Sequence, residues 1–280
     1  MKIQLAKKIG FCFGVKRAID MAEDALKTNK PIHSLGSIIH NKQVVNDLSK
    51  RGLKVVKAAD DIKSGACVIS SHGISPKIAK SISGRGIKII DTTCPFVLKA
   101  QRIAKRMSDS GYNVIIVGDA GHPEVKALVD FVSKRAFVVK DAEGAKSLKL
   151  DKADRYIVIS QTTQSTQNFL KVVELILSKR PRELKVYNTI CRDAEVRQEA
   201  ARKLARSQEA MLVVGGKNSA NTRRLLEVCQ NILNNSHLVE TEEDLKKRWF
   251  ENAHSVGITS GASTPDWIVK RVVKAVRSKL

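Results

Sequence analysis

Three cysteines are the residues whose type and placement point most directly to chemistry. Cys12, Cys94 and Cys191 each follow a short apolar run and precede a segment with the periodicity of an amphipathic helix. A helix N-terminus stabilises a thiolate, because its free N–H groups and the helix dipole place partial positive charge there. Three such thiolates can hold a zinc ion or an iron–sulfur cluster, and three protein ligands leave one coordination position open.

The remaining cysteines lack this placement. Cys67 lies in a strand-like apolar run and Cys229 lies in a helix-like segment, so we expect both to be buried small apolar residues. An odd number of cysteines without CxxC pairs is typical of neither a disulfide framework nor a zinc ribbon.

A second group of polar residues lies in loops that follow apolar runs. Three histidines occupy such loops, and imidazole can donate hydrogen bonds to phosphate oxygens near neutral pH. Hydroxyl and amide side chains occupy the other loops, where they can bind an anion or simply cap a helix. The residues are His40, His72, His122, Thr162, Ser219, Asn221 and Ser263.

One carboxylate stands among these neutral donors. Glu124 follows Gly121, His122 and Pro123 directly after an apolar run. A carboxyl group beside phosphate donors and a metal centre is a candidate proton carrier. The alternative is a first-turn acid that only interacts favourably with the helix dipole.

The loops also organise the predicted fold. Six strand–loop–helix units fall two to each third of the chain, and each third also contains one of the three cysteines. This order predicts an α/β protein of three similar parallel-sheet units, over 1–94 (with the N-terminal strand), 95–190 and 191–280. The carboxyl ends of parallel strands share one sheet edge, so three units that face a common centre bring the three thiolates together.

Composition restricts the class of protein. The 280 residues carry a formal charge of +22, but the surplus of basic residues is spread as ten, seven and five over the three thirds. With only 12 aromatic residues and no basic tail, this distribution argues against nucleic-acid binding. Cations interrupt the N-terminal apolar stretches, and no apolar run is long enough for a membrane helix. We therefore expect a cytoplasmic protein without a membrane or nucleic-acid partner.

The motifs together resemble those of a known family, the LytB-type 4-hydroxy-3-methylbut-2-enyl diphosphate reductases. The matching segments occur in family order and span nearly the whole chain. They are GFCFGVKRAI (10–19), SLGSIIHNKQVV (34–45), SSHGISP (70–76), DTTCPFV (91–97), GHPEV (121–125), SQTT (160–163), NTICRDAEVRQEA (188–200), GGKNSANTRRL (215–225) and TSGASTPDWIV (259–269).

The resemblance implies a trefoil of three α/β units around one 4Fe–4S cluster. Cys12, Cys94 and Cys191 would hold this cluster and leave its fourth iron open. The implied reaction is reductive dehydroxylation of an allylic diphosphate to isopentenyl and dimethylallyl diphosphate. Glu124 would supply protons with help from Thr162. The implied substrate-binding residues are His40, His72, His122, Thr162, Ser219, Ala220, Asn221 and Ser263.

Two departures from the family pattern and several alternatives accompany this interpretation. Ala220 stands where the family often has serine, so only its backbone N–H is available. The charged residues that follow Cys191, 192–195, replace less polar ones. A zinc-dependent phosphate-ester hydrolase using the same cysteines and histidines remains a rival, as does a basic nucleic-acid-binding protein. For the reductase, a basic surface favours an acidic ferredoxin or flavodoxin as electron donor.

Overall fold

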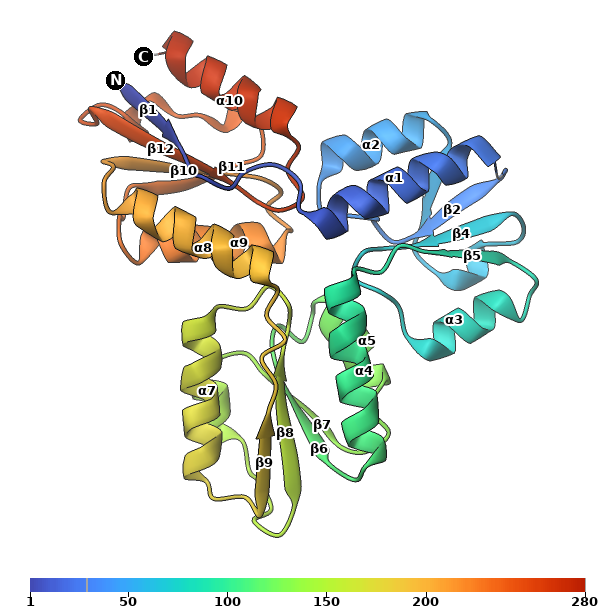
Figure 1. Cartoon of the computed structure of the whole chain (residues 1–280). Helices are drawn as coiled ribbons and strands as arrows, with labels where there is room; N and C mark the ends of the chain where they lie inside the picture. Colours follow the sequence, from blue (N-terminus) through green and yellow to red (C-terminus); the bar gives the residue numbers. More distant parts are fainter. Residues whose placement is uncertain (29, 280) are drawn as a thin grey trace. The chain divides into compact units, whose positions relative to one another are not determined.

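The computed structural model describes residues 1–28 and 30–279. Its strands are β1 (Lys2–Leu5), β2 (Ile32–Leu35), β3 (Leu53–Val56), β4 (Ala66–Ile69), β5 (Lys88–Asp91), β6 (Asn113–Val117), β7 (Ala136–Val139), β8 (Arg155–Ser160), β9 (Glu183–Val186), β10 (Ala210–Val214), β11 (Ser236–Val239) and β12 (Ser255–Ser260). They form three separate four-stranded sheets in the part of the chain just given (Figure 1).

Helices connect the strands. They are α1 (Phe13–Thr28), α2 (Lys42–Lys50), α3 (Pro76–Ser83), α4 (Pro95–Asp109), α5 (Pro123–Asp130), α6 (Ala142–Ser147), α7 (Thr166–Ser178), α8 (Arg192–Ala205), α9 (Ala220–Gln230) and α10 (Asp266–Lys279). Short 3-10 turns are η1 (Ala59–Asp61), η2 (Glu242–Asp244) and η3 (Lys247–Trp249). Within the described residues, none of the helices combines the length and the hydropathy needed to cross a bilayer.

All three sheets are parallel and share one strand order. The orders are β3-β2-β4-β5, β7-β6-β8-β9 and β11-β10-β12-β1. The two central strands of each sheet are β2 and β4, β6 and β8, or β10 and β12. They come first and third along the chain within their unit, whereas the strands that come second and fourth form the edges, with β1 counted as the fourth strand of the last sheet. The predicted fold class, α/β with three similar parallel-sheet units, is therefore confirmed. The arrangement of the units as a trefoil around a cluster stays a prediction.

The third sheet takes its fourth strand from the start of the chain. β1 pairs with β12, with Lys2 opposite Ser255 and Leu5 opposite Ile258. β1 is thus the edge strand of the last sheet, the position that β5 and β9 occupy in the other two sheets. The predicted divisions at 94/95 and 190/191 stay predictions.

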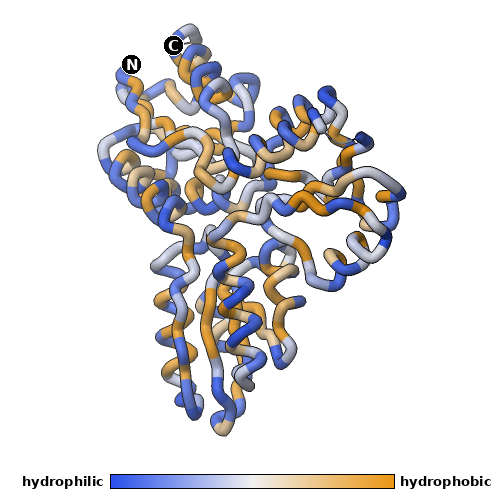
Figure 2. Tube along the Cα trace, turned by 45° about the vertical axis from the view of Figure 1, so that its right-hand side comes forward, coloured by the Kyte–Doolittle hydropathy of each residue, from blue (hydrophilic) through white to orange (hydrophobic). Residues whose placement is uncertain are grey.

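The cores are aliphatic, as the scarcity of aromatic residues requires. Hydrophobic segments, orange in Figure 2, recur along the chain. The central strands β6 (NVIIV) and β10 (AMLVV) are hydrophobic almost throughout, which is typical of parallel sheets covered on both faces. α4 and α5 cover one face of the β6–β9 sheet through Ala104 and Leu128, and α7 covers the other through Val172. α10 and α8 cover opposite faces of the sheet that contains β10 and β12.

By backbone contacts the chain divides into two compact units. One comprises Met1–Lys16, Ile39–Val44 and Arg192–Leu280, and contains the sheet of β1 and β10–β12. The other comprises Arg17–Ile38 and Val45–Cys191, and contains the sheets of β2–β5 and β6–β9.

Candidate active site

The six loops that the sequence singled out follow the first and third strands of each sheet. These strands are β2 and β4, β6 and β8, and β10 and β12. The chain leaves such a pair toward opposite sides of the sheet, and this switch point is where α/β proteins usually bind ligands. All the predicted site residues other than the cysteines lie in these loops or in the first turn of the helix that follows.

Glu124 and Thr162 are joined by two hydrogen bonds at the β6/β8 switch point. The Thr162 backbone N–H donates to Glu124 Oε1 at 2.6 Å, and the Thr162 hydroxyl donates to Oε2 at 2.8 Å. The strand register explains why Glu124 and Thr162 are in contact, because Val117 at the end of β6 lies opposite Ser160 at the end of β8. The two sides of one switch point thus supply a carboxyl group and a hydroxyl group in direct contact.

Burial changes the acidity of this carboxyl group. Glu124 is 1% exposed. Desolvation raises its pKa from 4.5 to about 7, while the backbone and side-chain hydrogen bonds from Thr162 favour the ionised form and oppose the shift. A group with this pKa can both hold and release a proton near neutral pH, as proton transfer requires. Because a hydroxyl both donates and accepts, Thr162 can remain hydrogen-bonded to either form of the carboxyl group.

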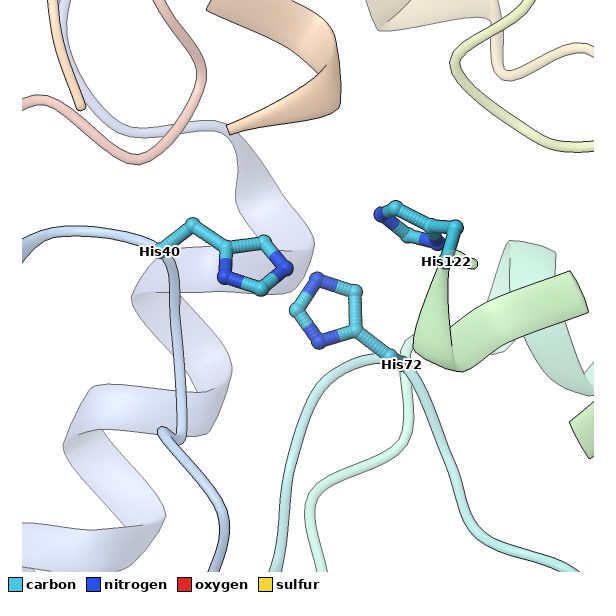
Figure 3. Close-up of side chains that lie close together, drawn as sticks. All are labelled: His40, His72 and His122. Carbon is cyan, nitrogen blue, oxygen red and sulfur yellow. The ribbon is translucent and has the colours of Figure 1, made fainter. Parts of the chain in front are cut away.

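Two predicted histidines lie next to each other in this unit. The rings of His72 and His122 stand edge to face, with centroids 5.3 Å apart and planes at 88° (Figure 3). His122 caps α5, since its Nδ1 accepts from the Glu124 backbone N–H at 3.2 Å. This bond places the proton of neutral His122 on Nε2, which makes that nitrogen a hydrogen-bond donor.

The β10/β12 switch point is built from the same parts without a carboxylate. Ser219 caps α9, because its Oγ accepts from the Thr222 N–H at 3.3 Å. Ala220 is the first residue of the helix, so its backbone N–H has no acceptor within the helix. Asn221 is 6% exposed, and its Nδ2 has no hydrogen-bond partner in 1–28 and 30–279. These donors suit an anion.

Ser263 and His40 complete this group within the first unit. Ser263 Oγ donates to the His40 carbonyl oxygen at 3.3 Å, which joins the loop after β12 to the segment 39–44. Burial, and then the charge of Arg223 on α9, lowers the pKa of His40. Both causes favour the neutral form of His40. Sequence reasoning missed Arg223, which directly follows the SANT segment.

Two glycines allow these loops to approach closely. A Cβ atom on Gly261 would lie 2.2 Å from Thr222 Oγ1, and one on Gly215 would lie 2.7 Å from the same atom. Gly215 also has a φ of 153°, which side chains disfavour. Any larger residue would push the loops apart and displace the donors on α9.

The three predicted cluster cysteines hold equivalent positions. Each lies after the edge strand β1, β5 or β9 and directly before α1, α4 or α8. The N–H of each also donates to the second residue after the neighbouring strand. The bonds run from Cys12 to Ala262 O at 3.0 Å, from Cys94 to Ser71 O at 3.0 Å and from Cys191 to Thr162 O at 2.8 Å.

The residues present fit a metal cluster. All three thiols are partly exposed at helix starts, whereas Cys67 and Cys229 are buried. Burial raises the pKa of Cys229 to about 12, so this thiol stays protonated, as expected of a packing residue. The Cys12 sulfur accepts from the Val15 N–H at 3.4 Å, and this bond partly opposes the burial that raises the pKa of Cys12. Donor type and position therefore suit an iron–sulfur cluster.

Arg197 is a second residue that sequence reasoning missed. In two sheets a threonine two residues before the cysteine donates to the last carbonyl of the neighbouring strand: Thr92 to Ile69 O, and Thr189 to Ser160 O. Gly10 holds this position before Cys12 and has no side chain.

The fully buried Arg197 replaces the missing hydroxyl, since its Nη1 donates to Ser260 O at 3.4 Å. Its Nε donates to Asp193 at 2.6 Å, and Lys8 lies 3.4 Å from the same carboxylate. Asp193, one of the charged residues after Cys191, is therefore neutralised by two cations. The i, i+4 spacing of Asp193 and Arg197 was the available signal, but it equally describes a surface pair.

The comparisons with known proteins agree with this architecture. The model of the LytB protein family matches residues 3–277. The chain is 46% identical over 274 residues to the 4-hydroxy-3-methylbut-2-enyl diphosphate reductase of Pelobacter propionicus, covering 98% of this chain and 96% of the relative. It is 42% identical over 280 residues to that of Campylobacter hominis, covering 99% of both.

Solved structures give the same result. The structure of E-1-hydroxy-2-methyl-but-2-enyl-4-diphosphate reductase from Plasmodium falciparum superposes with a TM-score of 0.92 at 28% identity, covering 98% of this chain and 87% of that one. A structure of (E)-4-hydroxy-3-methyl-but-2-enyl diphosphate reductase, described as the terminal enzyme of the non-mevalonate pathway, has a TM-score of 0.70 at 37% identity, covering 99% and 100%. On these matches the chain belongs to the LytB protein family.

Proposed function

We propose that this chain is a 4-hydroxy-3-methylbut-2-enyl diphosphate reductase, the last enzyme of the non-mevalonate isoprenoid pathway. The reaction takes two electrons and two protons. The allylic C–O bond breaks, the hydroxyl leaves as water, and a new C–H bond gives isopentenyl or dimethylallyl diphosphate. Within the family, the observation that carries the proposal is Glu124, a buried carboxyl group whose pKa of about 7 suits it to move protons.

Each group of residues has a role in this reaction. The donors around the β10/β12 switch point bind the diphosphate, because hydroxyl, amide and backbone N–H groups suit phosphate oxygens. Ser219, Ala220, Asn221, Ser263 and His40 are assigned to this role. His72 and His122 are assigned to the substrate as well, with His122 donating through Nε2. Binding at the diphosphate orients the reacting carbon without touching it.

Glu124 is assigned to proton transfer. Its carboxyl group supplies a proton and is recharged from solvent, while Thr162 holds the carboxyl group through two hydrogen bonds and orients the substrate hydroxyl. Low exposure excludes bulk water from the pair while the proton is transferred.

Cys12, Cys94 and Cys191 are assigned to one 4Fe–4S cluster. When bound, the cluster supplies electrons one at a time and Lewis acidity at its open iron. The protein's part is to present three thiolates at helix starts, with their backbone N–H groups fixed to neighbouring loops. The electron donor is an acidic ferredoxin or flavodoxin.

Anaerobic purification tests the proposal. We expect a brown protein with about four irons per chain that reduces the allylic diphosphate with a chemical one-electron reductant. Cys94→Ser should lose the visible absorption and most of the iron. Cys67→Ser is the matched control, since Cys67 is fully buried in β4 and should leave the iron content unchanged. A colourless, zinc-loaded wild type that hydrolyses phosphate esters would replace the reductase with the zinc hydrolase.

A further inference from the structure

One helix face next to a cluster cysteine is both basic and aromatic. α4 begins directly after Cys94, which is its N-cap. Phe96, two residues further on, is 41% exposed although it is a large apolar residue. Lys99, Arg102 and Arg106 are exposed and continue from Phe96 at helical spacing of three to four residues. We call Phe96, Lys99, Arg102 and Arg106 the α4 face.

The charge of the α4 face is uncompensated. In the ranges 1–28 and 30–279, no carboxylate lies within ion-pair distance of Lys99, Arg102 or Arg106, whereas the adjacent Lys105 pairs with Asp109 at 2.7 Å. Ala100, Ala104 and Met107 of α4 pack against the β6–β9 sheet, whereas the residues of the α4 face are exposed.

The start of the helix carries charges of both signs. Arg17 Nη1 donates to the Thr93 carbonyl oxygen at 3.3 Å, which adds a cation beside the first turn. The nearby carboxylate of Asp91 accepts from the backbone N–H and the hydroxyl of Thr93. The α4 face thus begins two residues after Cys94, where the cation of Arg17 is accompanied by the hydrogen-bonded carboxylate of Asp91.

We propose that the α4 face is the docking surface for an acidic one-electron carrier protein. The inference rests on the proposed function, because the reaction needs two electrons from outside the chain. Each encounter oxidises the carrier by one electron, so two encounters serve one turnover. Complementary charge steers such a partner and fixes its orientation, and an exposed aromatic ring supplies the apolar centre of a small interface.

A second basic helix face provides the rival and the control. On α10, Lys270, Arg271, Lys274 and Arg277 are also exposed, and Arg271 stacks on the ring of Trp267 at 5.2 Å. The α4 face is favoured because its helix begins directly after a proposed cluster ligand, and Phe96 lies two residues from Cys94 along the chain. α10 begins at Asp266 and carries no cysteine.

The test compares two charge reversals of equal size, Lys99→Glu/Arg102→Glu on α4 and Lys270→Glu/Lys274→Glu on α10. Each holoenzyme is assayed with reduced methyl viologen and, separately, with reduced acidic ferredoxin over a range of salt. We expect the α4 variant to raise the KM for ferredoxin about tenfold or more at low salt and to lose most of the salt dependence. Its dye-driven rate should stay within about twofold of wild type, as should all rates of the α10 variant.

A further variant and a binding measurement complete the design. Phe96→Ala should lower the ferredoxin-driven kcat but not the dye-driven kcat. Calorimetric titration with oxidised ferredoxin should show weakened binding for the α4 variant only, and it needs no turnover. If the wild type binds ferredoxin in this pattern but does not reduce the diphosphate with dye, the proposed function fails and the docking surface stands. An unchanged KM and affinity in the α4 variant, or a loss in the α10 variant, would overturn the inference.

Discussion

The switch points at β6/β8 and β10/β12 share the spacing between strand and helix but differ in the side chains that they present. In both, a helix begins six residues after the strand ends, with His122 or Ser219 as its N-cap. The second residue of the helix is Glu124 in one and Asn221 in the other, at the same distance from the strand. The fold thus places the second helix residue at the same position in both switch points, and the chemistry of that position depends on whether the residue is an acid or an amide.

The hydrogen-bond partners of Glu124 and Asn221 also differ. Glu124 is satisfied within the protein, since the Thr162 N–H and hydroxyl bind both carboxyl oxygens. In the second loop the residue matching Thr162 is Ala262, which has no hydroxyl, and the buried Asn221 Nδ2 has no partner in the described parts of the chain. This difference supports the proposed roles, which are proton transfer for Glu124 and ligand binding for Asn221.

The largest effect is expected from Glu124→Gln. The amide keeps the shape but cannot release a proton, so kcat should fall about 10²- to 10⁴-fold while KM stays within about threefold. Steady-state kinetics with a chemical reductant measures both. Glu143→Gln on the exposed side of α6 in the same unit is the matched control and should be silent. Full activity in Glu124→Gln would remove this residue as the proton carrier.

Arg197→Met tests how the end of β12 is held. Removing one member of a buried ion pair that also binds Ser260 O should lower the free energy of unfolding by about 3–5 kcal/mol. Thr189→Val at the end of β8 should cost about 1 kcal/mol, because a neutral hydrogen bond is lost. Urea unfolding of the anaerobic holoproteins measures both values.

Lys203→Met on the same helix is the control for Arg197→Met. Its side chain is 72% exposed and pairs with Glu199 at 3.5 Å, so the cost should stay below about 1 kcal/mol. Equal losses in Arg197→Met and Lys203→Met would show that Arg197 does not substitute for the missing threonine before Cys12.

The pH dependence of stability follows from the raised pKa of Glu124. Between pH 4.5 and 7 the folded protein keeps a proton that the unfolded chain has released, so this group makes stability fall as the pH rises across that window. The full effect is about 3 kcal/mol. The stability difference between Glu124→Gln and wild type should therefore change by that amount in favour of the variant from pH 4.5 to 7.5. A constant difference would contradict the raised pKa.

The effect of Asn221→Ala on catalysis should be smaller than that of Glu124→Gln. A single hydrogen bond to a charged ligand contributes about 1.5–3 kcal/mol, so KM for the diphosphate should rise about 10- to 100-fold with kcat little changed. Asn231→Ala at the exposed C-terminal cap of the same helix is the matched control. A fall in kcat without a change in KM would place Asn221 with the chemistry instead of the anion.

Much of this arrangement was predictable from local sequence. The alternation of apolar runs and amphipathic segments predicts the parallel α/β units, and the cysteine and loop motifs predict the residues at the switch points. The pairing of β1 with β12 was not predictable, because it joins residues about 250 positions apart and no local pattern records such a pairing.

Two features of the site depend on tertiary packing. The burial of Arg197 cannot be inferred from its helix, since an i, i+4 pair with Asp193 is typical of a solvated surface. The correspondence of Glu124 with Asn221 becomes visible only when both are counted from the ends of their strands, and the motifs GHPEV and KNSANT share no residues that would align them.

The proposed roles of the two switch points are proton transfer at β6/β8 and anion binding at β10/β12. Their most direct test is calorimetric titration of 4-hydroxy-3-methylbut-2-enyl diphosphate into the anaerobic holoenzymes. We predict that Glu124→Gln binds with a Kd within about threefold of wild type, although it turns over poorly. Asn221→Ala should bind about tenfold or more weakly. The reverse pattern, with binding lost in Glu124→Gln and kept in Asn221→Ala, would contradict the assignment of proton transfer to one switch point and anion binding to the other.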